Sequence, residues 1–325
     1  MKIEEKDIKM WSIIGSRATF GIAALEIAKK NKNLITLTCD VSTSAGLDRY
    51  RKMLPDQYLD LGIAEQNMIG VAAGLASENF DVITTSFAPF QTMRCCEQIK
   101  VNIGYMKQNI CMVGLASGLV LGPLGFTHCC IEDIGILRTI PGLNIISPAD
   151  SLETVKALNE TIESKKPTYI RLTGSSNNPM VYKKDYEFKI GKSITVNDGK
   201  NITIFSSGAM VYECIQVAKL IEQKNLSCKV VNMHTIKPLD TESIKLACQE
   251  SDLIVSVEEH NIIGGLGSAI AEIKASIANS PKMLILGIKD IYSKGGSYNF
   301  LKNKHRLTPT LIVEDVLKNY KINNE

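Results

Sequence analysis

The sequence predicts an α/β protein of two domains, each a mostly parallel sheet flanked by helices. Short runs rich in β-branched residues alternate with helical patterns along the chain, and this alternation is typical of parallel sheets. The 325 residues suffice for two domains that each bury a full core. Small polar residues, a proline and paired lysines fill 174–189. We therefore expect a linker at 176–190, between domains at 1–175 and 191–325.

Helical and extended patterns follow one another in a regular order. A helix that follows Pro148 is expected to be capped by Ser151, with Glu153 in its first turn. The other expected helices cover 18–31, 66–78 and 90–103. The expected strands of the first domain cover 34–39, 57–63, 82–86, 109–115, 143–147 and 168–172. The expected strands of the second domain cover 202–206, 228–232, 253–257 and 283–287.

Composition excludes several classes of protein. With 45% apolar and 22% charged residues, the chain has the balance of a soluble globular protein. No apolar run approaches the roughly 20 residues that span a bilayer, and the charged N-terminus lacks a signal-peptide core. A net charge of +3 without a basic stripe gives no basis for nucleic-acid binding. Nine cysteines without the spacing of a metal site predict reduced, mostly buried thiols in a cytoplasmic protein.

Glu65 stands in an unusual place for a charged residue. It lies in the stretch 61–68, between a short apolar strand and a helix whose small residues allow close packing. One interpretation is a first-turn carboxylate that the helix dipole favours. The other is a sheltered carboxyl that shares a proton with a ligand. The residues around Glu65 leave both interpretations open.

Three further motifs follow Glu65 along the chain. They are Thr-Ser-Phe-Ala-Pro-Phe-Gln-Thr-Met-Arg at 85–94, Gly-Phe-Thr-His at 125–128 and Glu-Glu-His-Asn-Ile-Ile-Gly-Gly-Leu-Gly at 258–267. Together with Leu-Gly-Ile-Ala-Glu-Gln-Asn-Met at 61–68, their order and spacing resemble the C-terminal half of transketolase. That half carries the pyrimidine-binding (Pyr) domain and the transketolase C-terminal domain. The last motif lacks the Gly-x-Gly-x-x-Gly spacing of a dinucleotide site, and in the family it is structural.

The resemblance implies an enzyme that depends on thiamine diphosphate. It implies that Glu65 hydrogen-bonds the ring nitrogen of the cofactor's aminopyrimidine and so helps to generate the reactive carbon. It places Phe90 against the aminopyrimidine, with Phe87 and Ile63 beside it, although core packing is the usual role of a phenylalanine. It places His128 in the substrate channel, where histidine suits proton transfer near neutral pH. The alternative is that His128 is an ordinary loop histidine, hydrogen-bonded to the backbone.

Phosphate recognition departs from the family. Arg17 and Ser44 occupy positions where transketolases contact the sugar phosphate, so both are predicted to bind substrate. Ala116 stands in place of a histidine and Gly174 in place of an arginine, and the loss of two cationic partners weakens phosphate binding. Leu124, also a predicted substrate contact, replaces an acid that binds a substrate hydroxyl. We therefore expect at least one substrate other than a standard sugar phosphate, for example a nucleotide-linked or deoxygenated keto sugar.

A second departure concerns the other end of the cofactor. Diphosphate and Mg²⁺ binding in this family uses a Gly-Asp-Gly motif with a downstream asparagine, and this sequence contains no Gly-Asp-Gly. We therefore expect a separate N-terminal transketolase subunit to hold the diphosphate and the metal. Two copies of this chain are expected to pair with two partner chains in an α2β2 assembly.

The predicted activity is transfer of a two-carbon ketol unit from a ketose donor to an aldose or keto-sugar acceptor. Two other thiamine-dependent roles stay open, a subunit like 1-deoxyxylulose-5-phosphate synthase and a 2-oxo-acid dehydrogenase beta-type subunit. Release of CO₂ from a pyruvate donor would distinguish them. A non-catalytic scaffold half is a further alternative, although a buried acid without a role would cost stability.

Overall fold

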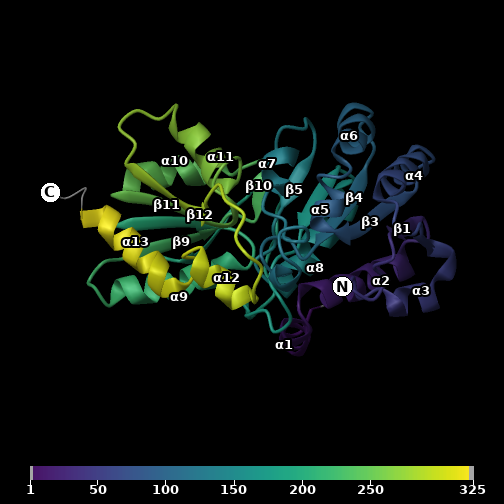
Figure 1. Cartoon of the computed structure of the whole chain (residues 1–325), viewed down its shortest axis with the longest axis horizontal. Helices are drawn as coiled ribbons and strands as arrows, with labels where there is room; N and C mark the ends of the chain where they lie inside the picture. Colours follow the sequence, from purple (N-terminus) through teal and green to yellow (C-terminus); the bar gives the residue numbers. More distant parts are fainter. Residues whose placement is uncertain (1–2, 322–325) are drawn as a thin grey trace.

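The computed structural model describes residues 3–321 and shows two α/β units that lie side by side (Figure 1). The first unit holds most of a seven-stranded sheet in the order β10-β5-β6-β4-β3-β1-β2. The second unit holds a five-stranded sheet in the order β12-β11-β8-β9-β7. Helices cover both faces of each sheet. The predicted fold class is therefore confirmed.

The strands of the first sheet run parallel, except for β10, which is antiparallel to β5. They are β1 (Leu34–Thr38), β2 (Tyr58–Asp60), β3 (Asp81–Phe87), β4 (Ile110–Leu115), β5 (Asn144–Ile146), β6 (Thr168–Arg171) and β10 (Thr235–Lys237). Because β10 comes from the second unit, the two units share this sheet. The carboxyl ends of all the parallel strands meet at one edge.

The helices of the first unit form a layer on each face of its sheet (Figure 1). On one face, α2 (Ser16–Lys30) and α8 (Ser151–Ser164) bury Phe20 and Leu158. On the other face, α4 (Glu65–Ser77) buries Met68 and Ile69. The shorter helices are α1 (Glu5–Ile14), α3 (Asp48–Met53), α5 (Ala88–Gln91), α6 (Cys96–Gln98) and α7 (Asp133–Leu137).

The second unit repeats the three-layer plan. Its strands are β7 (Ile194–Asn197), β8 (Ile202–Ser206), β9 (Cys228–Asn232), β11 (Leu253–Asn261) and β12 (Lys282–Ile288). Only the pairing of β7 with β9 is antiparallel. Its helices are α9 (Met210–Glu222), α10 (Thr241–Glu250), α11 (Leu266–Lys274), α12 (Tyr298–Lys304) and α13 (Pro309–Lys321). The helices α9 and α13 lie on one face, and α10 and α11 on the other (Figure 1).

Several element boundaries differ from the expected ones, and two of these differences have a clear physical cause. The strand expected at 57–63 ends at Asp60, because Gly62 turns the chain with a φ of +67°, which glycine adopts without steric cost. The cap of α8 is Asp150 rather than Ser151, and its carboxylate accepts a backbone N–H of the first turn at 2.9 Å. Aspartate and serine are both good caps, so residue type alone did not decide between these neighbours.

The single helix expected at 90–103 is wrong. The structure has α5, then α6, then a π-helix at Ile99–Tyr105. The side chain of Gln91 is buried and bonds back to β3, where it accepts from the amide of Ser86 and donates to the carbonyl of Thr84. These bonds hold the end of α5 against the sheet, so the chain turns there instead of continuing as a helix.

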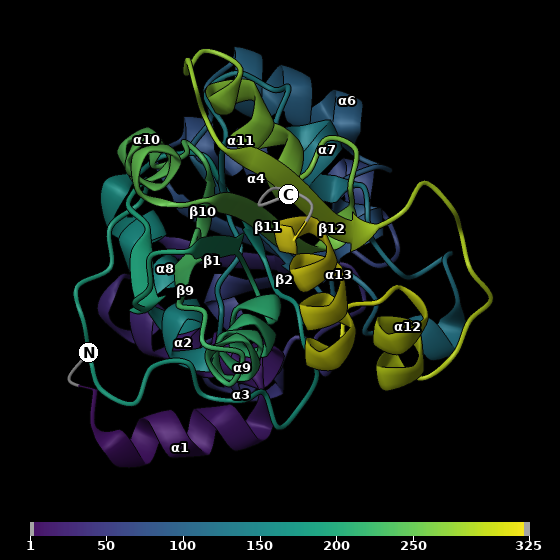
Figure 2. The same cartoon turned by 90° about the vertical axis from the view of Figure 1, so that its left-hand side faces the viewer.

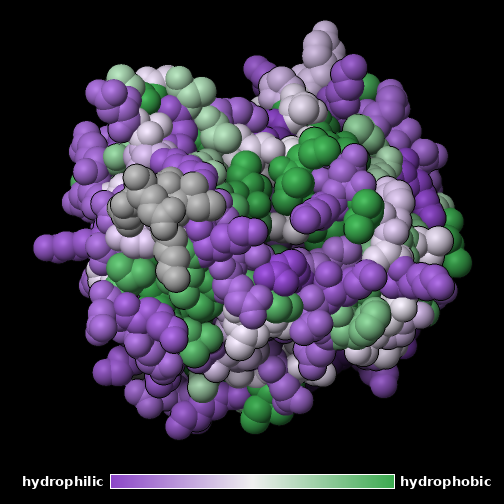
Figure 3. All heavy atoms as spheres, turned by 60° about the vertical axis from the view of Figure 1, so that its left-hand side comes forward, coloured by the Kyte–Doolittle hydropathy of each residue, from purple (hydrophilic) through white to green (hydrophobic). Residues whose placement is uncertain are grey.

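The connection between β6 and β7 contains neither helix nor strand. This is the character expected of a linker at 176–190, and its limits stay a prediction. All nine cysteines are free in this structure, and every one except Cys96 is buried, as expected of mostly buried thiols. On the face seen in Figure 3, hydrophobic residues interrupt a surface that is mostly hydrophilic. None of the helices within residues 3–321 combines the length and hydrophobicity needed to cross a membrane.

Candidate active site

The predicted site residues come from loops at the carboxyl edge of the first sheet. Ser44 follows β1, Glu65 follows β2, Phe90 follows β3, and His128 lies in the long loop after β4. Arg17 lies in the first turn of α2. Because α2 leads directly into β1, that first turn is at the same edge of the sheet. Ligands of open α/β sheets bind at this edge, where successive loops converge.

The turn between β2 and α4 is held by Asp60. Its carboxylate accepts hydrogen bonds from the amides of Asp40 and Gly62, each at 3.0 Å, and from the hydroxyl of Thr38 at 3.1 Å. Burial alone would raise the pKa of Asp60, but these bonds outweigh it and the pKa lies below its ordinary value. With this turn fixed, Ile63 is left 77% exposed, and the chain enters α4 directly afterwards.

Glu65 is the first residue of α4 and its side chain is only 3% exposed. Its Oε2 accepts a hydrogen bond from Nη1 of Arg94 at 2.7 Å. Its Oε1 has a weaker contact, with the hydroxyl of Ser86 at 3.4 Å. A buried carboxylate needs such a partner. The sequence motif at 85–94 contained Arg94, but nothing in its spacing indicated that the arginine pairs with Glu65.

Aromatic rings continue the site from Glu65. The guanidinium carbon of Arg94 lies 4.2 Å from the ring centroid of Phe90, a cation–π contact. The ring of Phe90 meets the imidazole of His128 edge-on, with centroids 5.3 Å apart, and meets Phe87 in the same way at 6.5 Å. The structure therefore brings together Glu65, Phe87, Phe90 and His128.

The loop that carries His128 is braced by the second unit. Phe126 lies between Tyr292 and His305, with ring centroids 5.4 Å and 6.4 Å away. The amide of Gly296 donates to the carbonyl of Gly122 at 3.0 Å. Figure 2 shows the long segment between β12 and α12 extending along this side of the molecule. The second unit thus shapes the loop from which His128 reaches the site.

A hollow of about 340 Å³ lies where α2 begins, lined by Arg17, Ser44 and the loop at 174–176. Within the described residues, the guanidinium of Arg17 makes no ion pair and no hydrogen bond. Burial without a carboxylate partner lowers the pKa of Arg17. A partly buried arginine beside a helix N-terminus suits an anionic group.

The two positions that lack the family's cationic side chains leave little room for them. Ala116 is fully buried and has a φ of +54°. Gly174 has a φ of +78°, and a Cβ there would lie 2.9 Å from Oδ1 of Asn178. The arginine nearest to Gly174 along the chain, Arg171, is buried and paired with Asp133 at 2.8 Å. Among the described residues that line the hollow, Arg17 is the charged one.

Leu124 ends a 3₁₀ turn that begins at Gly122, and its side chain is 57% exposed. It has no polar atoms with which to hold a hydroxyl. Leu124 and Ile63 are thus the two predicted contacts whose side chains are mostly exposed to solvent.

Two family models match the chain over most of its length. Transketolase, pyrimidine binding domain, matches residues 14–178, and transketolase, C-terminal domain, matches residues 191–310. The chain belongs to the transketolase family. This family depends on thiamine diphosphate, which agrees with the carboxyl and aromatic rings brought together at the sheet edge.

Two of the similar proteins are named as transketolase subunits. An apulose-4-phosphate transketolase subunit of Phocaeicola vulgatus is 36% identical over 86% of this chain and 89% of its own length. A 6-deoxy-6-sulfo-D-fructose transketolase subunit of Clostridium sp. strain MSTE9 is 33% identical over 91% of this chain and 92% of its own. Among solved structures, a split gene transketolase in an inactive beta4 tetramer matches with a TM-score of 0.87 and 31% identity, over 95% of this chain and 99% of that one.

The residues present fit the pyrimidine end of thiamine diphosphate. Among residues 3–321, Oε1 of Glu65 has only the long contact with Ser86, and Arg94, which binds the other oxygen, also packs on the ring of Phe90. Within residues 3–321, no group of three or more His, Cys, Asp or Glu side chains is arranged to hold a metal ion.

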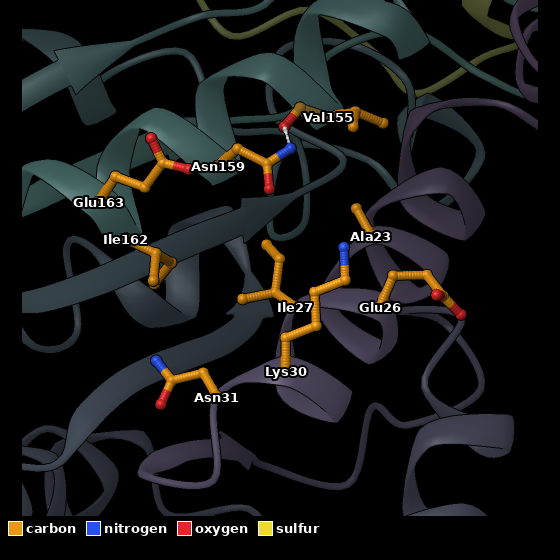
Figure 4. Close-up of a pocket in the computed structure, with 9 residues that line it drawn as sticks. All are labelled: Ala23, Glu26, Ile27, Lys30, Asn31, Val155, Asn159, Ile162 and Glu163. Carbon is orange, nitrogen blue, oxygen red and sulfur yellow. Dashed lines mark hydrogen bonds between the residues drawn. The ribbon is translucent and has the colours of Figure 1, made fainter. Parts of the chain in front are cut away.

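A second hollow, of about 260 Å³, lies between α2 and α8 (Figure 4). Its charged side chains are Glu26, Lys30 and Glu163. None of the predicted site residues lines it, and it lies on the helical layer rather than at the sheet edge.

Proposed function

We propose that this chain is the C-terminal subunit of a split transketolase, active together with an N-terminal partner. The observation that carries this proposal is the cluster of Glu65, Phe90 and His128, linked through Arg94. The assembled enzyme transfers a two-carbon ketol unit from a ketose donor to an aldose or keto-sugar acceptor. Relatives of nearly the same length that are named as transketolase subunits favour this role over a synthase or dehydrogenase subunit.

Each clustered side chain has a separate task in this proposal. Thiamine diphosphate, when bound, supplies the carbon that attacks the ketose carbonyl. Glu65 holds the ring nitrogen of the aminopyrimidine through Oε1 and shares a proton with it, which its shelter from water favours. Phe90 packs against the aminopyrimidine, with Phe87 and Ile63 at its border. His128 lies next to Phe90, where it moves a proton to or from the substrate oxygen near the reacting carbon.

The hollow around Arg17 binds the far end of the sugar. Arg17 supplies charge and Ser44 a hydroxyl, while Gly174 lines the hollow without a side chain. We infer that at least one substrate is not a standard sugar phosphate. The names of two relatives refer to apulose 4-phosphate and to 6-deoxy-6-sulfo-D-fructose. They support a branch of the family whose members act on different sugars.

The partner is proposed to hold the diphosphate and Mg²⁺, with two copies of each chain in an α2β2 assembly. A related chain that forms a beta4 tetramer is described as inactive, which supports the need for a partner. The absence of Gly-Asp-Gly from this sequence supports the same division of labour.

Calorimetric titration tests this division. We expect thiamine diphosphate with Mg²⁺ to bind tightly to the mixture of this chain with its N-terminal partner, and to neither chain alone. Tight binding by this chain alone would contradict the proposed partner-held diphosphate site. No binding by the mixture would contradict the transketolase role and favour a scaffold. Release of CO₂ from pyruvate by the mixture would instead favour a synthase or dehydrogenase subunit.

Leu124 is expected to limit the use of standard sugars. The wild-type assembly should turn over xylulose 5-phosphate with ribose 5-phosphate poorly, because Leu124 accepts no hydrogen bond from a substrate hydroxyl. Leu124→Asp should raise kcat/KM for this pair by about 10-fold to 100-fold, the effect of one charge-assisted hydrogen bond. The side chain is 57% exposed, so the change should leave stability nearly unaltered. Rapid turnover of this pair by the wild type would contradict the prediction, and Leu124→Asn serves as the uncharged control.

A further inference from the structure

Arg94 contacts both groups that the proposed function assigns to the aminopyrimidine. Its Nη1 donates to Oε2 of Glu65 at 2.7 Å, and its guanidinium carbon lies 4.2 Å from the ring centroid of Phe90. Its own backbone is tied to α4, because Nε2 of Gln66 donates to the carbonyl of Arg94 at 2.9 Å. One side chain therefore joins the start of α4 to the turn that follows β3.

The contact with Arg94 leaves the two oxygens of Glu65 unequal. Oε2 has a short, charge-assisted hydrogen bond, and such bonds fix both distance and direction. Among the described residues, Oε1 has only the 3.4 Å contact with Ser86. A ring nitrogen needs a single carboxylate oxygen as its partner, and Oε1 is the one that remains available.

No other charged side chain among residues 3–321 makes an ion pair or hydrogen bond with Glu65. The thiols of Cys39 and Cys95 lie near it, and both stay neutral. Burial first, and the nearby charge of Glu65 in addition, raise the pKa of Cys39 to about 11 and that of Cys95 to about 12. The orientation of the carboxylate therefore depends on Arg94.

We propose that Arg94 is a positioning residue, which holds Glu65 and Phe90 in the arrangement that receives the aminopyrimidine of thiamine diphosphate. This rests on the proposed function and adds a residue that the sequence motifs did not assign. Without Arg94, the carboxylate of Glu65 loses its fixed direction, and the ring of Phe90 loses the guanidinium packed on it. Arg94 itself is 42% exposed, so its removal opens no cavity in the core.

Cofactor affinity tests this role directly. The dissociation constant of thiamine diphosphate, with Mg²⁺ in excess, is measured by calorimetry on this chain assembled with its N-terminal partner. We expect Arg94→Met to raise it by about 10-fold to 100-fold, the effect of one hydrogen bond to a charged group. Arg94→Lys keeps the charge but not the planar guanidinium. Its dissociation constant should lie between those of the wild type and Arg94→Met.

Two controls separate positioning from a general loss of structure. Arg306→Met removes an arginine of the same exposure, 42%, which pairs with Asp315 in the second unit, and should leave cofactor affinity unchanged. Arg94→Ala leaves an exposed gap, so guanidinium ion at a non-denaturing concentration should restore part of the lost affinity. An ammonium salt at the same ionic strength should restore less. A merely structural effect would lower the unfolding temperature and would not respond to guanidinium.

Three results would overturn the assignment. Unchanged affinity in Arg94→Met would show that Glu65 and Phe90 need no such support. Tighter binding in Arg94→Met would show that Arg94 competes with the aminopyrimidine for the same two groups. Both leave the transketolase role intact, since the wild-type assembly still binds the cofactor. Absence of binding to the wild-type assembly would overturn the proposed function itself, and the role of Arg94 with it.

Discussion

Replacing Glu65 with glutamine is expected to lower kcat of the assembled enzyme by about 10²-fold to 10⁴-fold, the usual contribution of a positioned proton-transfer group. Glutamine keeps the shape of the side chain and still offers an oxygen to the 2.7 Å hydrogen bond from Arg94. An amide does not exchange a proton with a ring nitrogen in the way a carboxyl does. Steady-state rates at saturating thiamine diphosphate and Mg²⁺ measure the change.

The Glu65→Gln variant should assemble with its partner as the wild type does. Arg94 is 42% exposed and keeps an oxygen acceptor, so no buried charge is left without a partner. Glu26→Gln is the matched control, because Glu26 forms an exposed pair with Lys29 at 2.6 Å and lines only the hollow between α2 and α8. A Glu65→Gln enzyme that assembles and keeps most of the wild-type rate would favour the scaffold interpretation.

Local patterns predicted most of the strands that pair within their own unit, but not β7, which pairs with β9. The runs at 202–206 and 228–232 form β8 and β9 with the expected limits. β10 was missed, because its three residues pair with β5 of the other unit, and no local pattern records that partner. The break after α5 was missed for a similar reason, since Gln91 bonds to a strand that precedes it.

The site was predictable in part. Motif order indicated Glu65, Phe90 and His128, and the structure brings these three side chains together. The pairing with Arg94 depends on the packing of α4 against the turn after β3, which spacing did not reveal. The brace on the His128 loop involves Tyr292, whose hydroxyl donates to Glu132, 160 residues earlier in the chain, at 2.9 Å. Contacts over such separations need tertiary structure.

Arg171→Met is expected to lower the free energy of unfolding by about 3–5 kcal/mol, the cost of breaking a buried ion pair from one side. Arg171 is 2% exposed and its Nε lies 2.8 Å from Oδ2 of Asp133, which is fully buried. Its Nη2 donates to the carbonyl of Cys130 at 3.2 Å and to that of Glu259 at 2.9 Å. The substitution therefore removes the cationic partner of a buried carboxylate, which keeps the hydrogen bond from the hydroxyl of Tyr169 at 2.7 Å, and one donor from each of the two carbonyls. Urea unfolding, followed by far-UV circular dichroism, measures the loss.

The bonds of Arg171 also join the two units, because Cys130 belongs to the first and Glu259 to the second. The double variant Arg171→Met, Asp133→Asn removes both charges and should lose less stability than the sum of the single changes, as expected for directly coupled groups. Arg306→Met, at an exposed pair, should cost only about 0–1 kcal/mol. A loss that small for Arg171→Met would mean that water reaches Asp133. The expected larger loss would show that this pair is one of the contacts that stabilise the junction of the two units.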